Sequence, residues 1–69
     1  MIVKAVRIGS NDRRGREVTI NTAVAEDKKK APELFEMVKA LQTGGRAKYV
    51  QPNERLTRGG QTFLILEAT

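Results

Sequence analysis

The sequence predicts an α+β fold, in which a small antiparallel sheet of about four strands carries one helix on one face (β-β-α-β-β). Three observations predict this class. Residues 17–24 alternate in polarity with the period of a strand, residues 31–43 carry one apolar stripe at helical spacing, and residues 63–66 form an unbroken apolar run. Because the chain has 69 residues, we expect a single small domain over residues 1–69.

Two strands and a polar turn are expected in the first third of the chain. Residues 2–8 and residues 17–24 alternate in polarity, and residues 9–15 between them are polar with a glycine at each end. The two strands are therefore expected to pair as a hairpin with a long basic tip. In the first strand, Lys4 interrupts the face that is otherwise apolar.

One helix is expected over residues 31–43. Pro32 suits its first turn, where a missing backbone N–H leaves no hydrogen bond unmade. Apolar residues then recur every three or four positions from Leu34 to Leu41, so one stripe of the helix faces a core. The two glycines that follow residue 43 supply a left-handed stop.

The last third of the chain is expected to hold a second hairpin. We expect a third strand at residues 46–51, a loop over residues 52–60 and a last strand at residues 61–68. The last strand is apolar on both faces, which is typical of a central strand or of one covered by a partner. Leu56 in the loop is expected either to pack over the small core or to anchor a protein contact.

One helix cannot cover both faces of a four-stranded sheet. The face away from the helix is expected to be only partly polar and to carry Val3, Ala5, Arg7 and Thr19. Two arrangements follow: a solvated second face, or a homodimer in which a second copy covers it.

The residue inventory argues against catalysis. The chain has no cysteine and no histidine, which excludes thiolate and imidazole metal sites and the nucleophile–base pairs built from these residues. Glu33 and Glu36 stand near the start of the expected helix, where carboxylates stabilise the helix dipole. Neither Gly-Gly pair fits a phosphate-binding loop motif. We therefore expect a protein that is not an enzyme, with no catalytic residue, no metal site and no cofactor.

Charge is the most informative property of the sequence. Thirteen Lys and Arg residues against eight Asp and Glu residues give a net charge of +5, which favours nucleic acid or an acidic protein surface as partner. The basic residues cluster at the hairpin tip, before the helix, along the third expected strand and in the last loop. The candidate binding residues are Arg13, Arg14, Arg16, Lys28, Lys29, Lys30, Arg46, Lys48, Arg55 and Arg58.

These clusters lead to a first hypothesis: a small binding module whose basic hairpin tip and loops contact nucleic acid or another polyanion. Arginine binds phosphate in a bidentate manner and enters narrow minor grooves of DNA. Base stacking is not expected to contribute much, since Tyr49 is the only aromatic residue not assigned to the core.

Two further hypotheses are open. The architecture of a short, cysteine-free hairpin–helix–hairpin chain resembles small proteins of bacteriophages and mobile elements, including anti-CRISPR and host-takeover inhibitors. That resemblance implies a protein that binds a nucleic-acid-handling host protein and blocks it. The third hypothesis is a structural subunit that self-assembles through its last strand. Because no apolar stretch could span a bilayer and no leader pattern is visible, we expect a cytoplasmic protein with no membrane partner.

Overall fold

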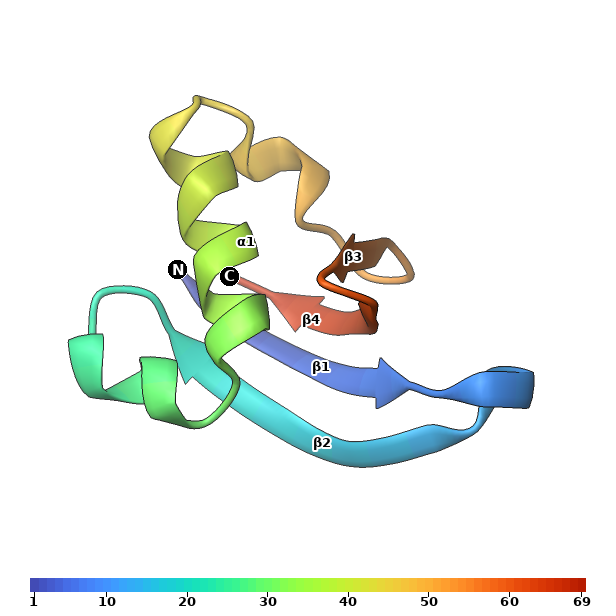
Figure 1. The fold of residues 1–69 in the computed structure, drawn as a ribbon. Coiled ribbons are helices and arrows are strands. Elements are labelled where there is room, and N and C mark those ends of the chain that lie inside the picture. The colour runs from blue at the N-terminus through green and yellow to red at the C-terminus, as the bar shows by residue number, and fades with distance from the viewer.

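Four antiparallel strands form one sheet in the order β2-β1-β4-β3 in the computed structural model, which describes residues 1–69. The strands are β1 (Ile2–Ile8), β2 (Arg14–Asn21), β3 (Arg55–Arg58) and β4 (Gln61–Ala68), and one helix, α1 (Pro32–Thr43), packs across the sheet (Figure 1). The structure therefore confirms the α+β class, with one helix on one face of an antiparallel sheet.

The helix begins and ends close to the predicted positions. Pro32 occupies its first turn. At the other end Gly45 adopts a positive φ of 73°. The N–H of Gly45 donates to the carbonyl of Gln42 (3.1 Å), and the N–H of Arg46 donates to the carbonyl of Leu41 (2.7 Å). This is the left-handed stop that satisfies the last carbonyl groups of a helix, and glycine adopts it without strain. The structure contains no helix with the length and apolar character needed to cross a membrane.

The hydrophobic core lies between α1 and one face of the sheet. Leu34 and Val38 of the helix are fully buried and meet Ile20 and Ile65 from the strands. Burial of such aliphatic side chains is worth about 1.5–3 kcal/mol each, which makes this layer the main source of stability. The buried members of the core are Val3, Ala5, Ile20, Ala31, Leu34, Phe35, Met37, Val38, Val50, Phe63 and Ile65.

The assignment of faces in the first strand was wrong. Val3 and Ala5 point toward the helix and are fully buried, whereas the sequence analysis placed them on the uncovered face. The alternate set, which contains Lys4, lies on the uncovered face instead. The physical reason is Lys4 itself, because an ammonium group under the helix would lose its hydration without gaining an ion-pair partner there. Thr19 was placed correctly, because it pairs with Lys4 across the ladder and shares its face.

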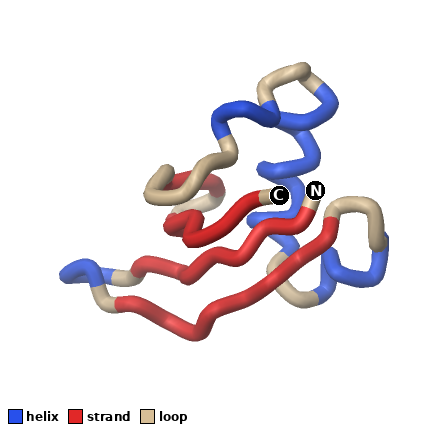
Figure 2. Tube along the Cα trace, turned by 180° about the vertical axis from the view of Figure 1, so that it is seen from behind, coloured by secondary structure: helices blue, strands red, loops and turns tan.

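The uncovered face of the sheet is shielded by its own side chains. Figure 2 shows this side, with α1 behind the strands. Val6 and Leu64 are outside the core layer, yet they are only 2% and 8% exposed. Lys4 extends across the face, and its Nζ lies 3.2 Å from a carboxylate oxygen of Glu17 on β2 and 3.9 Å from one of Glu67 on β4. The hydrogen bond to Glu17 raises the pKa of Lys4. One lysine thus links three strands on this face.

The second hairpin differs from the prediction in its first strand. Residues 46–51, expected as a strand, contain the short 3-10 helix η3 (Ala47–Tyr49). The strand β3 lies instead inside residues 52–60, which were expected to be a loop. Gly59 and Gly60 have φ values of 59° and 77° and form the two-residue turn between β3 and β4. β3 is an edge strand of mostly polar sequence. Its pairing with β4 stabilises it as a strand, since its own residues do not alternate in polarity as a half-buried strand would.

Candidate nucleic-acid interface

The tip of the first hairpin is a short turn of fixed geometry. The N–H of Gly9 donates to the carbonyl of Arg13 (2.7 Å), which closes the turn around the 3-10 helix η1 (Ser10–Asp12). Asn11 and Asp12 have φ values of 60° and 56°. Asparagine and aspartate tolerate this left-handed conformation better than other side-chain-bearing residues do. Polar turn residues therefore define the direction in which the adjoining arginines project.

A β-bulge lies directly behind this turn. The pairing register of β1 with β2 shifts between Val6 and Ile8, so that Arg7 is opposed by both Gly15 and Arg16. A bulge increases the local twist of a strand and redirects its side chains. Gly15 lies across from Arg7 at this bulge, and a Cβ there would be in van der Waals contact with the Arg7 carbonyl oxygen at 3.4 Å. The bulge thereby brings a β1 arginine next to the arginines of β2.

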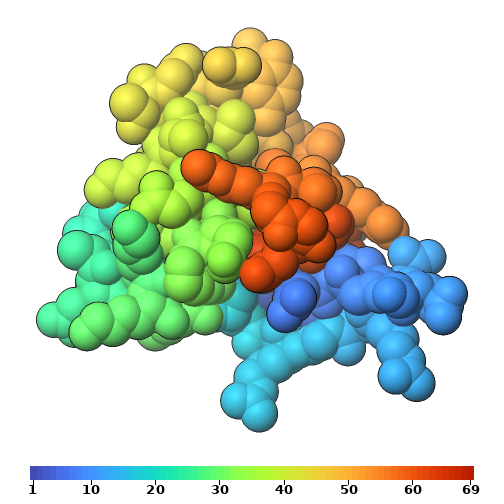
Figure 3. All heavy atoms as spheres, viewed as in Figure 1, coloured from blue at the N-terminus to red at the C-terminus, as the bar shows by residue number.

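Four exposed arginines occupy this end of the hairpin, and we call them the arginine tip. None of them takes part in an ion pair. The tip consists of Arg7, Arg13, Arg14 and Arg16. Three of these arginines and two glycines line a shallow hollow of about 230 Å³ that contains no acidic residue. The tip projects from the body of the protein as the blue to cyan segment of Figure 3.

A second, larger hollow of about 420 Å³ lies beside the tip. Arg7 and Arg16 line it together with Lys30 and the first residues of α1, where the helix dipole is positive. Glu17 and Glu33 also line it, so its charge is mixed. Of these two hollows, only the smaller one, at the arginine tip, is lined without an acidic residue, and the neighbouring Asp12 of the turn lies 3.5 Å from Arg55.

Of the three lysines before the helix, two are engaged in ion pairs. Lys28 Nζ lies 2.6 Å from a carboxylate oxygen of Glu36 on α1, and this hydrogen bond lowers the pKa of Glu36. Lys30 Nζ lies 3.2 Å from Oδ1 of Asp27. Lys29 has no acidic partner. Lys28 thus links the short 3-10 helix η2 (Ala25–Lys29) to α1, whereas Lys30 pairs with a residue of η2 itself.

Asp27 organises the same connection. The backbone N–H of Asn21, the last residue of β2, donates to Asp27 Oδ2 at 2.8 Å. This bond is the main reason why the pKa of Asp27 is lowered, and Lys30 contributes in the same direction. The carboxylate therefore ties the end of the first hairpin to the segment that leads into α1.

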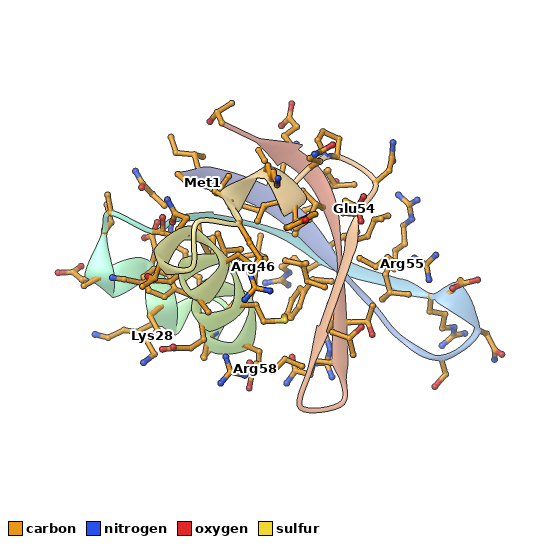
Figure 4. The ribbon with its side chains drawn as sticks, turned by 90° about the horizontal axis from the view of Figure 1, so that it is seen from above. Met1, Lys28, Arg46, Glu54, Arg55 and Arg58 are labelled. Carbon is orange, nitrogen blue, oxygen red and sulfur yellow. The ribbon has the colours of Figure 1, made fainter.

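The remaining candidate residues are not part of the arginine tip, although Arg55 reaches its turn, with Nη1 3.5 Å from Oδ1 of Asp12. Arg46, Arg55 and Arg58 line a groove of about 350 Å³ between α1 and β3, and all three are labelled in Figure 4. Lys48 lies over the ring of Tyr49, with Nζ 5.5 Å from the ring centre. Tyr49 is 52% exposed, as expected for the aromatic residue outside the core. Nine of the ten residues named from the sequence therefore belong to three regions, namely the tip, the segment before α1 and this groove, and Lys48 lies beside Tyr49 and lines none of the three hollows.

Arg7 is the member of the tip that sequence reasoning missed. The sequence predicted it on the uncovered face, and this was wrong, because Arg7 lines the hollow beside the start of α1 together with Ala31 and Pro32. The available signal was its position two residues before the turn, but which residues of the second strand it faces depends on the register and on the bulge.

No known protein family, curated protein or solved structure matches this chain. No group of three or more acidic side chains comes together in a way that could hold a metal ion. The arginine tip brings together four arginines that form no ion pair.

Proposed function

We propose that the protein is a non-enzymatic binding module that contacts nucleic acid through its arginine tip. The observation that carries this proposal is the absence of any acidic partner for the four arginines, which a bulged hairpin holds together on one projecting end. Elsewhere on the surface, several cations are neutralised by carboxylates at 2.6–3.9 Å. Arginines left unpaired at one end are free to bind phosphate groups.

Phosphate is the chemical group that this arrangement suits. A guanidinium group donates two parallel hydrogen bonds to a phosphate, and four such groups in proximity match consecutive phosphates of a strand. A projecting two-stranded ribbon also has a shape that enters a groove of a duplex. The tip has no aromatic side chain on which bases could stack. We therefore expect binding driven by the phosphate backbone, with little base preference.

Equilibrium binding to labelled duplex DNA, single-stranded DNA and RNA tests the proposal. The test variant is Arg13→Glu/Arg14→Glu, and the matched control is Lys29→Glu/Lys48→Glu, which changes the net charge equally at two unpaired lysines away from the tip. We expect the tip variant to lose about tenfold or more of its affinity and the control to lose much less. Equal losses in the two variants, or no binding of the unmodified protein at low salt, would contradict the proposal.

A further inference from the structure

The groove between α1 and β3 combines an apolar floor with basic walls. Met37 and Leu41 of the helix and Leu56 of the strand line it together with Ala40, which is exposed. Leu56 is half-buried and packs against the core, so it presents only part of its side chain to the groove. The floor is therefore a fixed part of the fold.

The charge along this groove has a single sign. Arg46 and Arg58 line it and have no ion-pair partner, and no acidic residue lines it. Arg55 lines it as well, while its guanidinium lies 3.5 Å from Asp12 of the hairpin turn. The Arg46 side chain folds back toward the end of α1, since a Cβ on Gly44 would lie 3.7 Å from its Nε. Both arginines without an ion-pair partner thus line the groove beside its apolar floor.

One wall of the groove is the open edge of the sheet. β3 is the last strand in the order β2-β1-β4-β3, so it has a neighbour on one side only. All four residues of β3 line the groove, and since successive side chains point to opposite faces, the groove runs along the backbone of this edge. Ile65 donates its N–H to the carbonyl of Glu54 at 2.8 Å. The alternation of an antiparallel ladder then directs the backbone groups of Arg55 and Thr57 away from β4.

We propose that this groove binds an extended acidic segment of a partner protein. The segment pairs with the open edge of β3, places apolar side chains on the floor and sets its carboxylates against Arg46 and Arg58. The apolar floor favours a peptide over a nucleic-acid strand, because a phosphate backbone has no apolar group to place there. The groove and the hollow of the arginine tip share no lining residue, so variants can test this proposal independently of nucleic-acid binding.

Titration of the isotopically labelled protein, followed by NMR, tests the proposal with a defined probe. The probe is a short synthetic peptide in which leucine and aspartate alternate. Two control peptides replace every leucine by serine or every aspartate by asparagine. We expect saturable binding of the probe and no binding of the two control peptides. The chemical-shift changes should be largest at Met37, Leu41 and Leu56. We also expect the amide hydrogens of Arg55 and Thr57 to become protected from exchange.

Two variants separate the groove from general electrostatic attraction. Ala40→Glu places a carboxylate in the groove at an exposed helical position, and Arg58→Glu reverses one wall charge. Each is expected to lower the affinity for the probe by about tenfold, while Lys29→Glu, which lies outside the groove, has little effect. Equal binding of the three peptides, shifts confined to the arginine tip, or displacement of the probe by an oligothymidine strand bound in the groove would each overturn the proposal.

Discussion

Arg7 and Gly15 face each other across the bulge of the first hairpin. A Cβ on Gly15 would lie 3.4 Å from the Arg7 carbonyl oxygen and 3.7 Å from its Cβ. At this bulge two residues of β2 oppose one of β1, and a side chain longer than a Cβ at position 15 would extend toward Arg7. The position of the arginine tip therefore depends on a backbone feature as well as on its arginines.

The first prediction concerns Arg7, which lies on β1 rather than in the turn. Because it shares the hollow with Arg13 and Arg14, Arg7→Glu should weaken nucleic-acid binding about as much as Arg13→Glu does. Both single variants should retain the thermal stability of the parent, since these side chains are exposed and unpaired. Fluorescence anisotropy and thermal unfolding measure the two quantities. If the Arg7 variant binds with the affinity of the parent, Arg7 does not contribute to the interface and β1 is not part of it.

A second prediction concerns Gly15, which faces Arg7 across the bulge. Gly15→Val should press a branched side chain against Arg7 and displace that arginine from the hollow. Affinity for a duplex is then expected to fall severalfold while all four arginines are still present. Gly9→Ala is the control, because a Cβ there would meet only the Arg13 carbonyl at an ordinary distance of 3.7 Å. If Gly15→Val binds as tightly as the parent, the bulge does not position the tip.

A third prediction links stability to pH through Asp27. The pKa of this carboxyl group is lowered from its usual 3.8, chiefly by the hydrogen bond from Asn21. A lowered pKa means that the ionised form stabilises the fold fully above the usual value, and that this contribution is lost as the pH falls through the lowered one. The pKa of Glu36 is likewise lowered from its usual 4.5, chiefly by the hydrogen bond from Lys28. Its contribution to stability is therefore also lost as the pH falls through the lowered value. Asp27→Asn should therefore lower the melting temperature by a few degrees at neutral pH and make it less sensitive to acid.

Thermal unfolding of the parent and of Asp27→Asn between pH 2 and pH 7 measures this effect. The control is Glu26→Gln, which removes a neighbouring carboxylate that has no ion-pair partner. Parallel pH profiles for the parent and the Asp27 variant would show that the hydrogen bond from Asn21 does not stabilise the fold.

A fourth prediction concerns the uncovered face of the sheet. Lys4, held between Glu17 and Glu67, crosses a face on which Val6 and Leu64 are already buried. Lys4→Leu should leave two carboxylates unpaired around a continuous apolar patch, and such patches promote self-association. Sedimentation velocity should show the parent as a monomer at all concentrations and the variant as an associating species. Concentration-dependent association of the parent would instead favour a homodimer through this face.

The sequence was sufficient to predict α1 and most of the first hairpin. Pro32 and the glycines after Thr43 mark both ends of the helix by backbone chemistry that does not depend on the rest of the fold. The alternation around Val18 and Ile20 predicted correctly which face of β2 meets the helix, since both contact the core. Local signals of this kind are readable before any tertiary contact is known.

The errors arose where tertiary contacts decide the structure. The segment 46–51 has the composition of a strand. In the structure Val50 is buried in the core, and the residues before it form the 3-10 helix η3 (Ala47–Tyr49) in place of a strand. β3 has a single apolar residue, Leu56, and forms because β4 offers a partner. The Gly59-Gly60 turn was the one local signal for this strand.

The candidate site divides in the same way. The three arginines around the turn could be found from their clustering, whereas Arg7 required the register of the ladder. Lys28 and Lys30 look equivalent to the tip arginines in sequence, and only the structure shows that Glu36 and Asp27 neutralise them.

The salt dependence of duplex binding tests the central claim most directly. If the four arginines of the tip each neutralise one phosphate, the logarithm of the association constant should fall with the logarithm of salt concentration with a slope of about −3.5. Arg13→Glu/Arg14→Glu should reduce that slope by about half, while Lys29→Glu/Lys48→Glu leaves it close to the parent value. A flat dependence in the parent, or the same reduction in both variants, would contradict a nucleic-acid interface at the arginine tip.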